Sequence, residues 1–292
     1  MTDPVPTASG IADAHNDTSR AQATGHGARA APIETLPEGW DAATGFHRLK
    51  RVLRPRLLAD VEARAVDAIV SRARALLRHA HRPTRPIALR FPEAGALDLD
   101  ATLESPRPWQ PHDIRVRRME PRSADAVAIL DMSLSMTGEK VALTALACAI
   151  LKLRLEHLAV VQFDTEATVL VRVGESVPVR ELVRRILTVP AQGYTNIEAG
   201  LRRGLEQLEQ ARHRERVGIL MTDGIANTGG DPVEAACRYP RLHVVQIGTE
   251  ERQGARTCAA MADAGRGRRY RAIIYAQLPT VVRQLVRDCF HA

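Results

Sequence analysis

The sequence predicts an α/β fold in which a doubly wound, Rossmann-like and mostly parallel sheet carries helices on both faces. Two observations support this prediction. Residues 124–130 form an almost wholly apolar run that ends at Asp131, which is typical of a strand buried on both faces of a parallel sheet. From there to the end of the chain, short apolar runs alternate with segments of helical length, which favours parallel strands joined by helical crossovers.

The later elements follow from the same alternation. Strands are expected at residues 159–163, 168–173, 217–221, 242–247 and 269–274. Helices are expected at residues 138–155, 179–188, 196–211, 232–239, 255–264 and 278–289. The helix at 232 has a well-defined start, because Asp231 can cap it and Pro232 suits its first turn.

The chain of 292 residues divides into three predicted regions. Residues 1–44 lack apolar periodicity and are expected to be a disordered tail. Residues 45–123 form an N-terminal region that is helical at first, with apolar residues three and four apart, and then proline-rich, with short extended pieces at 87–91 and 113–118. Residues 124–292 form the main domain.

Composition and charge narrow the function. Aromatic residues make up 3% of the chain and hydrophobic residues 45%, so the core must be aliphatic. The net charge of +7 allows an acidic partner. Binders of single-stranded nucleic acid use aromatic platforms, and no aromatic cluster is present. The positive charge also has a simpler explanation, which is an arginine-rich composition.

The cysteines and the termini suggest a cytoplasmic protein. The four cysteines are far apart and form no CxxC pair, so neither a disulfide framework nor a zinc site is expected. The N-terminus has no basic start followed by an apolar stretch, so no signal peptide is expected. No apolar run approaches the roughly 20 residues of a membrane span, and we expect no membrane segment.

Oxygen-bearing side chains gather where three predicted strands or loops meet the following helices. Asp131, Ser133 and Ser135 follow the first buried strand, Thr195 precedes a helix, and Asp223 follows the strand at 217–221. In open α/β sheets, ligands bind at the carboxyl ends of the strands. These five residues are therefore the candidate site.

The motifs DMSLSM, GYTNIEAGL and LMTDG resemble the three parts of the metal-ion-dependent adhesion site of von Willebrand factor A (VWA) domains. The resemblance covers residues 124–289. It implies the VWA fold and a divalent cation, Mg²⁺ or else Mn²⁺ or Ca²⁺, held by the hydroxyls of Ser133, Ser135 and Thr195 and, directly or through water, by Asp131 and Asp223. Such an ion retains much of its charge and binds an Asp or Glu of a partner protein. Leu134 stands where many relatives have Gly, and Met136 matches the usual Met.

Each of these residues also has a simpler explanation. Ser133 and Ser135 could cap the helix that follows, and Thr195 could form a capping box with Glu198. Asp223 before a glycine could be a turn residue. The occurrence of all five residues in the expected order favours the metal site over five separate explanations.

Other motifs are weaker. His79 and His81 could bind metal, but solvated residues of a basic helix explain them better. The basic stretches 48–56 and 72–85 could contact phosphates or simply dock a partner. The chain has neither a GxxxxGK[ST] loop nor a GxSxG elbow, which argues against P-loop ATP binding and against Ser133 as an acyl-transfer nucleophile.

The sequence thus predicts a non-catalytic, metal-dependent interaction module. The run from Asp131 to Lys140, DxSxSMxGxK, is similar to the bacterial magnesium-chelatase D-subunit branch and to proteins that work with MoxR-type AAA+ ATPases. This similarity implies an adaptor that docks an AAA+ ATPase to a substrate in metal insertion or protein maturation, although the AAA+ module of the D subunit is missing here.

Two other functions remain as alternatives. One is a Mg²⁺-dependent phosphatase of the haloacid dehalogenase type, in which Asp131 would follow the buried strand. That class needs a second Asp as general acid, and Ser133 stands at its position. The other alternative is nucleic-acid binding through the arginine-rich N-terminal helices, which would show a steep salt dependence.

Overall fold

The computed structural model describes residues 38–78, 84–104, 110–121, 124–211, 215–248 and 251–289. Its main sheet has six strands in the order β6-β5-β4-β7-β8-β9, and every neighbouring pair is parallel except β5 and β6. The predicted fold class is therefore confirmed. The strands are β4 (Asp125–Asp131), β5 (His157–Phe163), β6 (Ala167–Val171), β7 (Arg216–Thr222), β8 (Leu242–Ile247) and β9 (Arg269–Ala272).

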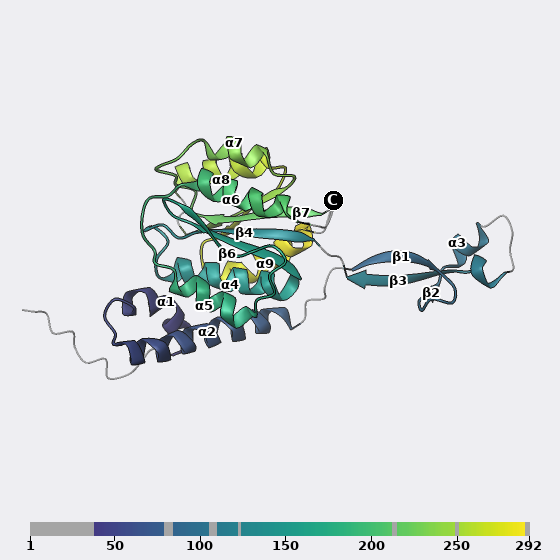
Figure 1. Cartoon of the computed structure of the whole chain (residues 1–292), viewed down its shortest axis with the longest axis horizontal. Coiled ribbons are helices and arrows are strands. Elements are labelled where there is room, and N and C mark those ends of the chain that lie inside the picture. The colour runs from purple at the N-terminus through teal and green to yellow at the C-terminus, as the bar shows by residue number, and fades with distance from the viewer. Residues whose placement is uncertain are drawn as a thin grey trace, which may run out of the picture. The chain divides into compact units, whose positions relative to one another are not determined.

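Helices cover both faces of this sheet (Figure 1). The buried run of β4 serves both faces, because successive side chains of a strand point to opposite sides. Ala128 and Leu130 lie in one buried cluster, with residues of α4 (Glu139–Arg154), α5 (Val179–Thr188) and α9 (Leu278–Cys289). Val127 and Ile129 lie in the other, with residues of α6 (Ile197–Glu209), α7 (Pro232–Cys237) and α8 (Arg252–Ala264).

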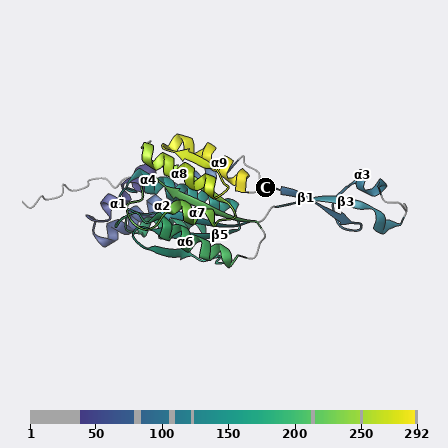
Figure 2. The same ribbon diagram turned by 90° about the horizontal axis from the view of Figure 1, so that it is seen from above.

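Helix α4 is buried around its whole circumference, since every residue from Val141 to Leu151 is buried. A helix that is apolar on all sides needs cover on all sides. The sheet covers one side, and the pair α1 (Gly39–Leu49) and α2 (Pro55–Leu77) covers much of the other, as both views show (Figures 1 and 2). The pair contributes Phe46, Val61 and Ile69 to the same buried cluster as α4.

The packing of α1 and α2 on α4 changes the predicted boundaries at residues 44 and 124. The tail predicted at residues 1–44 is wrong for residues 39–44, because α1 begins at Gly39. Three apolar side chains of α1 (Ala42, Ala43 and Phe46) are buried, and they stabilise a helix that starts before the basic stretch. Residues 1–37 lie outside the described residues. The predicted boundary at residue 124 lies one residue before β4, and one buried cluster includes residues on both sides of it.

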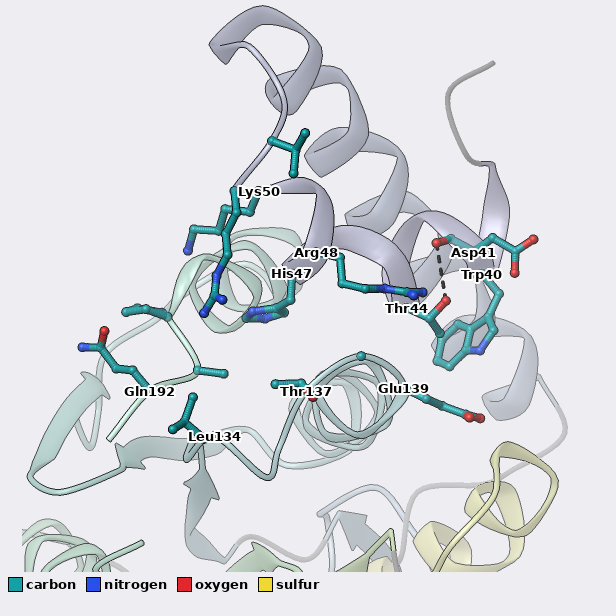
Figure 3. Close-up of a pocket in the computed structure, with 15 residues that line it drawn as sticks. Trp40, Asp41, Thr44, His47, Arg48, Lys50, Leu134, Thr137, Glu139 and Gln192 are labelled. Carbon is teal, nitrogen blue, oxygen red and sulfur yellow. Dashed lines mark hydrogen bonds between the residues drawn. The ribbon is translucent and has the colours of Figure 1, made fainter. Parts of the chain in front are cut away.

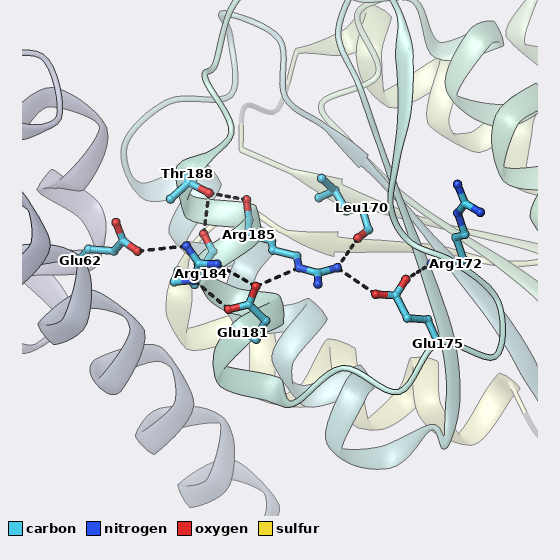
Figure 4. Close-up of polar contacts among 8 residues, drawn as sticks. All are labelled: Glu62, Leu170, Arg172, Glu175, Glu181, Arg184, Arg185 and Thr188. Atoms are coloured by element: carbon cyan, nitrogen blue, oxygen red, sulfur yellow. Dashed lines mark hydrogen bonds and ion pairs between the residues drawn. The ribbon is translucent and has the colours of Figure 1, made fainter.

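Charged side chains also join α2 to α5 (Figure 4). Arg184 lies 4.0 Å from Glu62, and Arg180 pairs with Asp67. Hydrogen bonds from Arg184 and its neighbour Arg185 lower the pKa of Glu181 to about 2. Such surface pairs contribute about 0 to 1 kcal/mol each, so the buried aliphatic side chains dominate the attachment of α2.

Two basic side chains of α2, of which Arg72 belongs to the stretch 72–85, make similar contacts. Arg64 of α2 lies 3.2 Å from Glu38, and the guanidinium of Arg72 stacks over Trp40 at 4.8 Å from the ring centroid. These side chains hold α1 against α2. His79 and His81, which the sequence offered as metal ligands, lie outside the described residues.

The proline-rich segment forms a separate antiparallel sheet of order β1-β3-β2. Its elements are β1 (Thr84–Arg90), β2 (Ala96–Leu97), α3 (Leu99–Leu103), a short 3-10 turn (Pro111–Asp113) and β3 (Arg115–Pro121). None of these residues belongs to either buried cluster of the main sheet. Throughout the described ranges, no helix combines the length and apolar character needed to cross a bilayer.

The attachment of α1 gives a first prediction. Phe46 is 1% exposed, and Phe46→Ala should lower the free energy of unfolding by about 3 to 5 kcal/mol, because it leaves a cavity between α1 and its neighbours. Urea denaturation measures this change. The control Val52→Ala, at a side chain 61% exposed just after α1, should shift stability by about 0.5 kcal/mol or less. Equal stability of the two variants would contradict the docking of α1.

Candidate functional site

Asp131, at the end of β4, anchors the first loop. Its side chain is fully buried and both carboxylate oxygens accept hydrogen bonds. The backbone N–H of Ser133 donates to Oδ1 at 3.0 Å, and the hydroxyl of Thr222 donates to Oδ2 at 2.6 Å. Thr222 is in place because β4 and β7 are parallel neighbours that end side by side. The Asp131 side chain is therefore fixed in one orientation.

Ser133 and Ser135 place two hydroxyls next to each other. Their Oγ atoms are 3.1 Å apart; Ser133 is buried and Ser135 is exposed. Neither serine caps the following helix, because the residue that precedes α4 is Gly138. The capping explanation of the two serines is thus wrong, and their hydroxyls are left for another role.

Thr195 enters from a different loop. Its backbone N–H donates to Oδ1 of Asn227 at 2.7 Å, and its carbonyl accepts from the N–H of Asn227 at 3.2 Å. The capping box proposed for Thr195 is absent, because Asn196 caps α6 through a 3.0 Å hydrogen bond from the N–H of Ala199. Thr195 itself is 3% exposed.

Asp223 follows β7 and is paired with a lysine. Lys140 Nζ donates to Asp223 Oδ2 at 3.1 Å, and the N–H of Ile225 donates to Oδ1 at 3.3 Å. The aspartate is 1% exposed. The lysine stem runs across Gly248, where a Cβ would lie 2.3 Å from Lys140 Cε. A glycine at this position leaves the stem room to reach Asp223.

Hydrogen bonds tie these loops together. The N–H of Gln192, in the Thr195 loop, donates to the carbonyl of Met132 at 3.2 Å. Asn227 connects the Thr195 loop to the loop that begins at Asp223. The loops with the five predicted side chains therefore meet at one end of the sheet, at the carboxyl ends of β4 and β7.

Burial and neighbouring groups shift the pKa of Asp131. Burial raises the pKa of Asp131 to about 6, hydrogen bonds from Thr222 and Ser133 oppose this rise, and the nearby charge of Asp223 adds to it. A dication near Asp131 would favour the ionised form. The described ranges contain no group of three or more His, Cys, Asp or Glu that could hold a metal. The five predicted ligands are instead three alcohols and two carboxylates. Such oxygens suit a hard cation.

The sequence prediction overlooked three contributors to this geometry. Thr222 orients Asp131, Asn227 holds the backbone of Thr195, and Lys140 pairs with Asp223. A polar Thr at the buried end of a strand was an available signal for Thr222. Lys140 ends the DxSxSMxGxK run, but the sequence does not identify its partner, which lies 83 positions away. Nothing in the sequence separates Asn227 from ordinary surface residues, because its partner lies 32 positions away.

Comparison with known proteins identifies the family. The family model described as "VWA domain containing CoxE-like protein" matches residues 63–247, which include all five candidate residues. The chain belongs to this VWA family. None of the curated proteins compared matches the chain significantly.

Solved structures with a similar VWA fold include three that differ widely in origin. An aerotolerance-related membrane protein from Bacteroides fragilis is 16% identical, covering 57% of this chain and 98% of its own, with a TM-score of 0.49. A von Willebrand factor type A protein from Catenulispora acidiphila is 19% identical, and the match covers 59% of this chain and 44% of that protein, with a TM-score of 0.47. Proximal thread matrix protein 1 of the mussel byssus has a zinc-occupied metal-ion-dependent adhesion site (MIDAS) motif in its solved structure. It is 20% identical, and the match covers 57% of this chain and 48% of that protein, with a TM-score of 0.45.

The pairing of Lys140 with Asp223 gives a second prediction. In metal-free buffer, Lys140→Gln should lower the free energy of unfolding by about 1 to 3 kcal/mol, because it leaves a buried carboxylate without its partner. Lys152→Gln makes the same change of charge on the same helix and should have little effect. Chemical denaturation of both variants in EDTA tests this. If both lose equal stability, the ion pair has no special role.

Proposed function

We propose that Asp131, Ser133, Ser135, Thr195 and Asp223 form a metal-ion-dependent adhesion site that holds a divalent cation, Mg²⁺ or else Mn²⁺ or Ca²⁺. The observation that supports the proposal is that hydrogen bonds join the loops bearing these residues, while the Oγ atoms of Ser133 and Ser135 lie 3.1 Å apart. Ser133, Ser135 and Thr195 would supply hydroxyl oxygens. Asp131 and Asp223 would act directly or through water.

The charge of the site supports a carboxylate as the incoming ligand. Two aspartates and the ammonium of Lys140 together carry one net negative charge, so a dication makes the whole centre positive. A site that stays positive attracts an Asp or Glu from outside. Lys140 thereby offsets the aspartate that would otherwise neutralise the ion.

Apolar side chains beside the site support a protein as the source of that carboxylate. Leu134 is 60% exposed and Tyr194 is 65% exposed, and each is the neighbour of a proposed metal ligand. Exposed apolar and aromatic side chains around a polar centre are typical of protein interfaces. The Gly-to-Leu departure at Leu134 thus adds contact area at the rim.

The same geometry argues for a binding module over a phosphatase. A phosphatase nucleophile must reach substrate, whereas Asp131 is fully buried with both oxygens engaged. We infer a non-catalytic adaptor. Its partner would be a MoxR-type AAA+ ATPase or the substrate of that ATPase in metal insertion or protein maturation, which rests on the resemblance to the magnesium-chelatase D-subunit branch.

Metal titration tests the site itself. Ser133→Ala and Thr195→Ala should each weaken Mn²⁺ or Mg²⁺ binding about tenfold or more, because each removes a proposed ligand oxygen. Isothermal titration calorimetry measures the affinity. Ser176→Ala, at an exposed serine outside the site, is the matched control and should bind like the unmodified chain. Equal affinity in all four proteins would refute the ligand assignment.

Partner capture tests the function. The immobilised chain should retain its partner in Mg²⁺ and lose it in EDTA, and Ser133→Ala should lose it in both buffers. Mass spectrometry of the eluates identifies the proteins retained. Recovery of the same proteins in every condition would exclude docking through the metal.

A further inference from the structure

A large pocket adjoins the proposed metal site on the side of α1. Its volume is about 1140 Å³. One wall is α1 and the turn after it, and the other wall is the Ser133 loop, the start of α4 and residues 190–192. Figure 3 shows His47, Arg48 and Lys50 on the first wall and Leu134, Thr137 and Gln192 on the second.

The pocket and the metal site share their loops. Leu134 lines the pocket and lies between Ser133 and Ser135 in the chain. Gln192 lines it three residues before Thr195 and is hydrogen-bonded to the backbone of the first loop. The pocket is therefore lined by close chain neighbours of the proposed metal ligands in both loops.

The α1 wall is positively charged. Arg48, Lys50 and Arg51 line the pocket, against only Asp41 and Glu139. Lys50 is already engaged, because its ammonium donates to the carbonyl of Thr188. Arg48 and Arg51 are exposed and form no ion pair with any residue that the structure describes. Two guanidinium groups thus remain available to an anionic ligand, and guanidinium pairs readily with carboxylates.

The remaining lining suits a peptide with some apolar character. Trp40, Leu134 and Pro190 contribute apolar surface. His47 Nε2 is buried without a hydrogen-bond partner among the described residues. Burial and the nearby charges of Lys50 and Arg51 lower the pKa of His47 to about 4, so the ring is neutral near pH 7 and adds no charge to the wall.

One wall of this pocket lies outside the residues that match the family model. The family match begins at residue 63, within α2, so all of α1 lies before it. The loops of the metal site belong to the family, whereas the charged wall beside them belongs to the preceding segment of this chain. The wall is therefore placed to determine which carboxylate-bearing partner is accepted.

We propose that the pocket receives an acidic segment of the partner protein, whose flanking Asp or Glu side chains pair with Arg48 and Arg51 while one carboxylate of the same segment binds the metal. This proposal rests on the metal site proposed above. In this proposal, the arginines of α1 and the turn after it select the partner. The metal provides the central contact with its carboxylate.

Peptide binding separates the two parts of this mechanism. The probe is a fluorescein-labelled nonapeptide with a central Asp and Glu at the other positions, and the comparison peptide has Gln in place of every Glu. Fluorescence anisotropy is measured with the full chain in Mg²⁺ at low salt. Compared with the unmodified chain, the double variant Arg48→Gln/Arg51→Gln should bind the acidic peptide about fivefold to tenfold more weakly. It should bind the Gln peptide with the same affinity as the unmodified chain.

The control Arg283→Gln/Arg287→Gln removes the same charge from exposed positions on α9, which does not line the pocket, and should bind the acidic peptide like the unmodified chain. Equal weakening by both double variants would overturn the proposed pocket, because long-range charge would then explain the effect. Equal affinity of the unmodified chain for the acidic peptide and the Gln peptide would also overturn the proposed pocket.

Two further outcomes distinguish the pocket from the metal site. If the acidic peptide binds equally in Mg²⁺ and EDTA but still depends on Arg48 and Arg51, the pocket is supported and the metal-site proposal fails. If an oligothymidylate, and not the acidic peptide, depends on the two arginines, the surface binds nucleic acid and the proposed occupant is wrong.

Discussion

The burial of α4 is the constraint on which the rest of the molecule depends. This helix is apolar on every side, so the sheet alone cannot shield it from water. The pair α1 and α2 supplies the missing cover, with Phe46 and Ile69 in the shared cluster. Because α4 starts just after the Ser133 loop, the helices that cover it also bring α1 beside that loop. One packing requirement thus creates both the stability of the fold and the pocket next to the site.

A second constraint is the burial of two carboxylates at one end of the sheet. Asp131 and Asp223 are both shielded from water, and buried charges are costly unless they are paired or hydrogen-bonded. Thr222 and the backbone of Ser133 hydrogen-bond one, and Lys140 pairs with the other. The remaining charge is small enough to tolerate in the folded chain, yet it favours a cation. The polar alcohols nearby complete an oxygen-rich environment.

The surface around the site includes residues inside the family match and residues that precede it. The loops at the ends of β4 and β7 lie within the residues that match the family, and they supply the proposed metal chemistry. Helix α1 and the turn after it precede those residues and supply Arg48 and Arg51. A single carboxylate does not distinguish one partner protein from another. Two arginines at a fixed position beside the metal site would also require acidic residues near that carboxylate. Under the proposal above, changes at these two arginines would alter which partner binds without changing the metal site.

The sequence by itself determined the α/β fold and the order of its main elements, because apolar periodicity reports which faces are buried; α5 and β8 have the predicted bounds. Local motifs likewise indicated the candidate residues from Asp131 to Asp223. Only the tertiary structure decided that Gly138 and Asn196 occupy the cap positions of α4 and α6, and that Lys140 pairs with Asp223. Lys140 and Asp223 lie 83 positions apart in the chain, so no local pattern encodes their contact. The caps are local, but several nearby residues could serve as caps, and the tertiary packing selects among them.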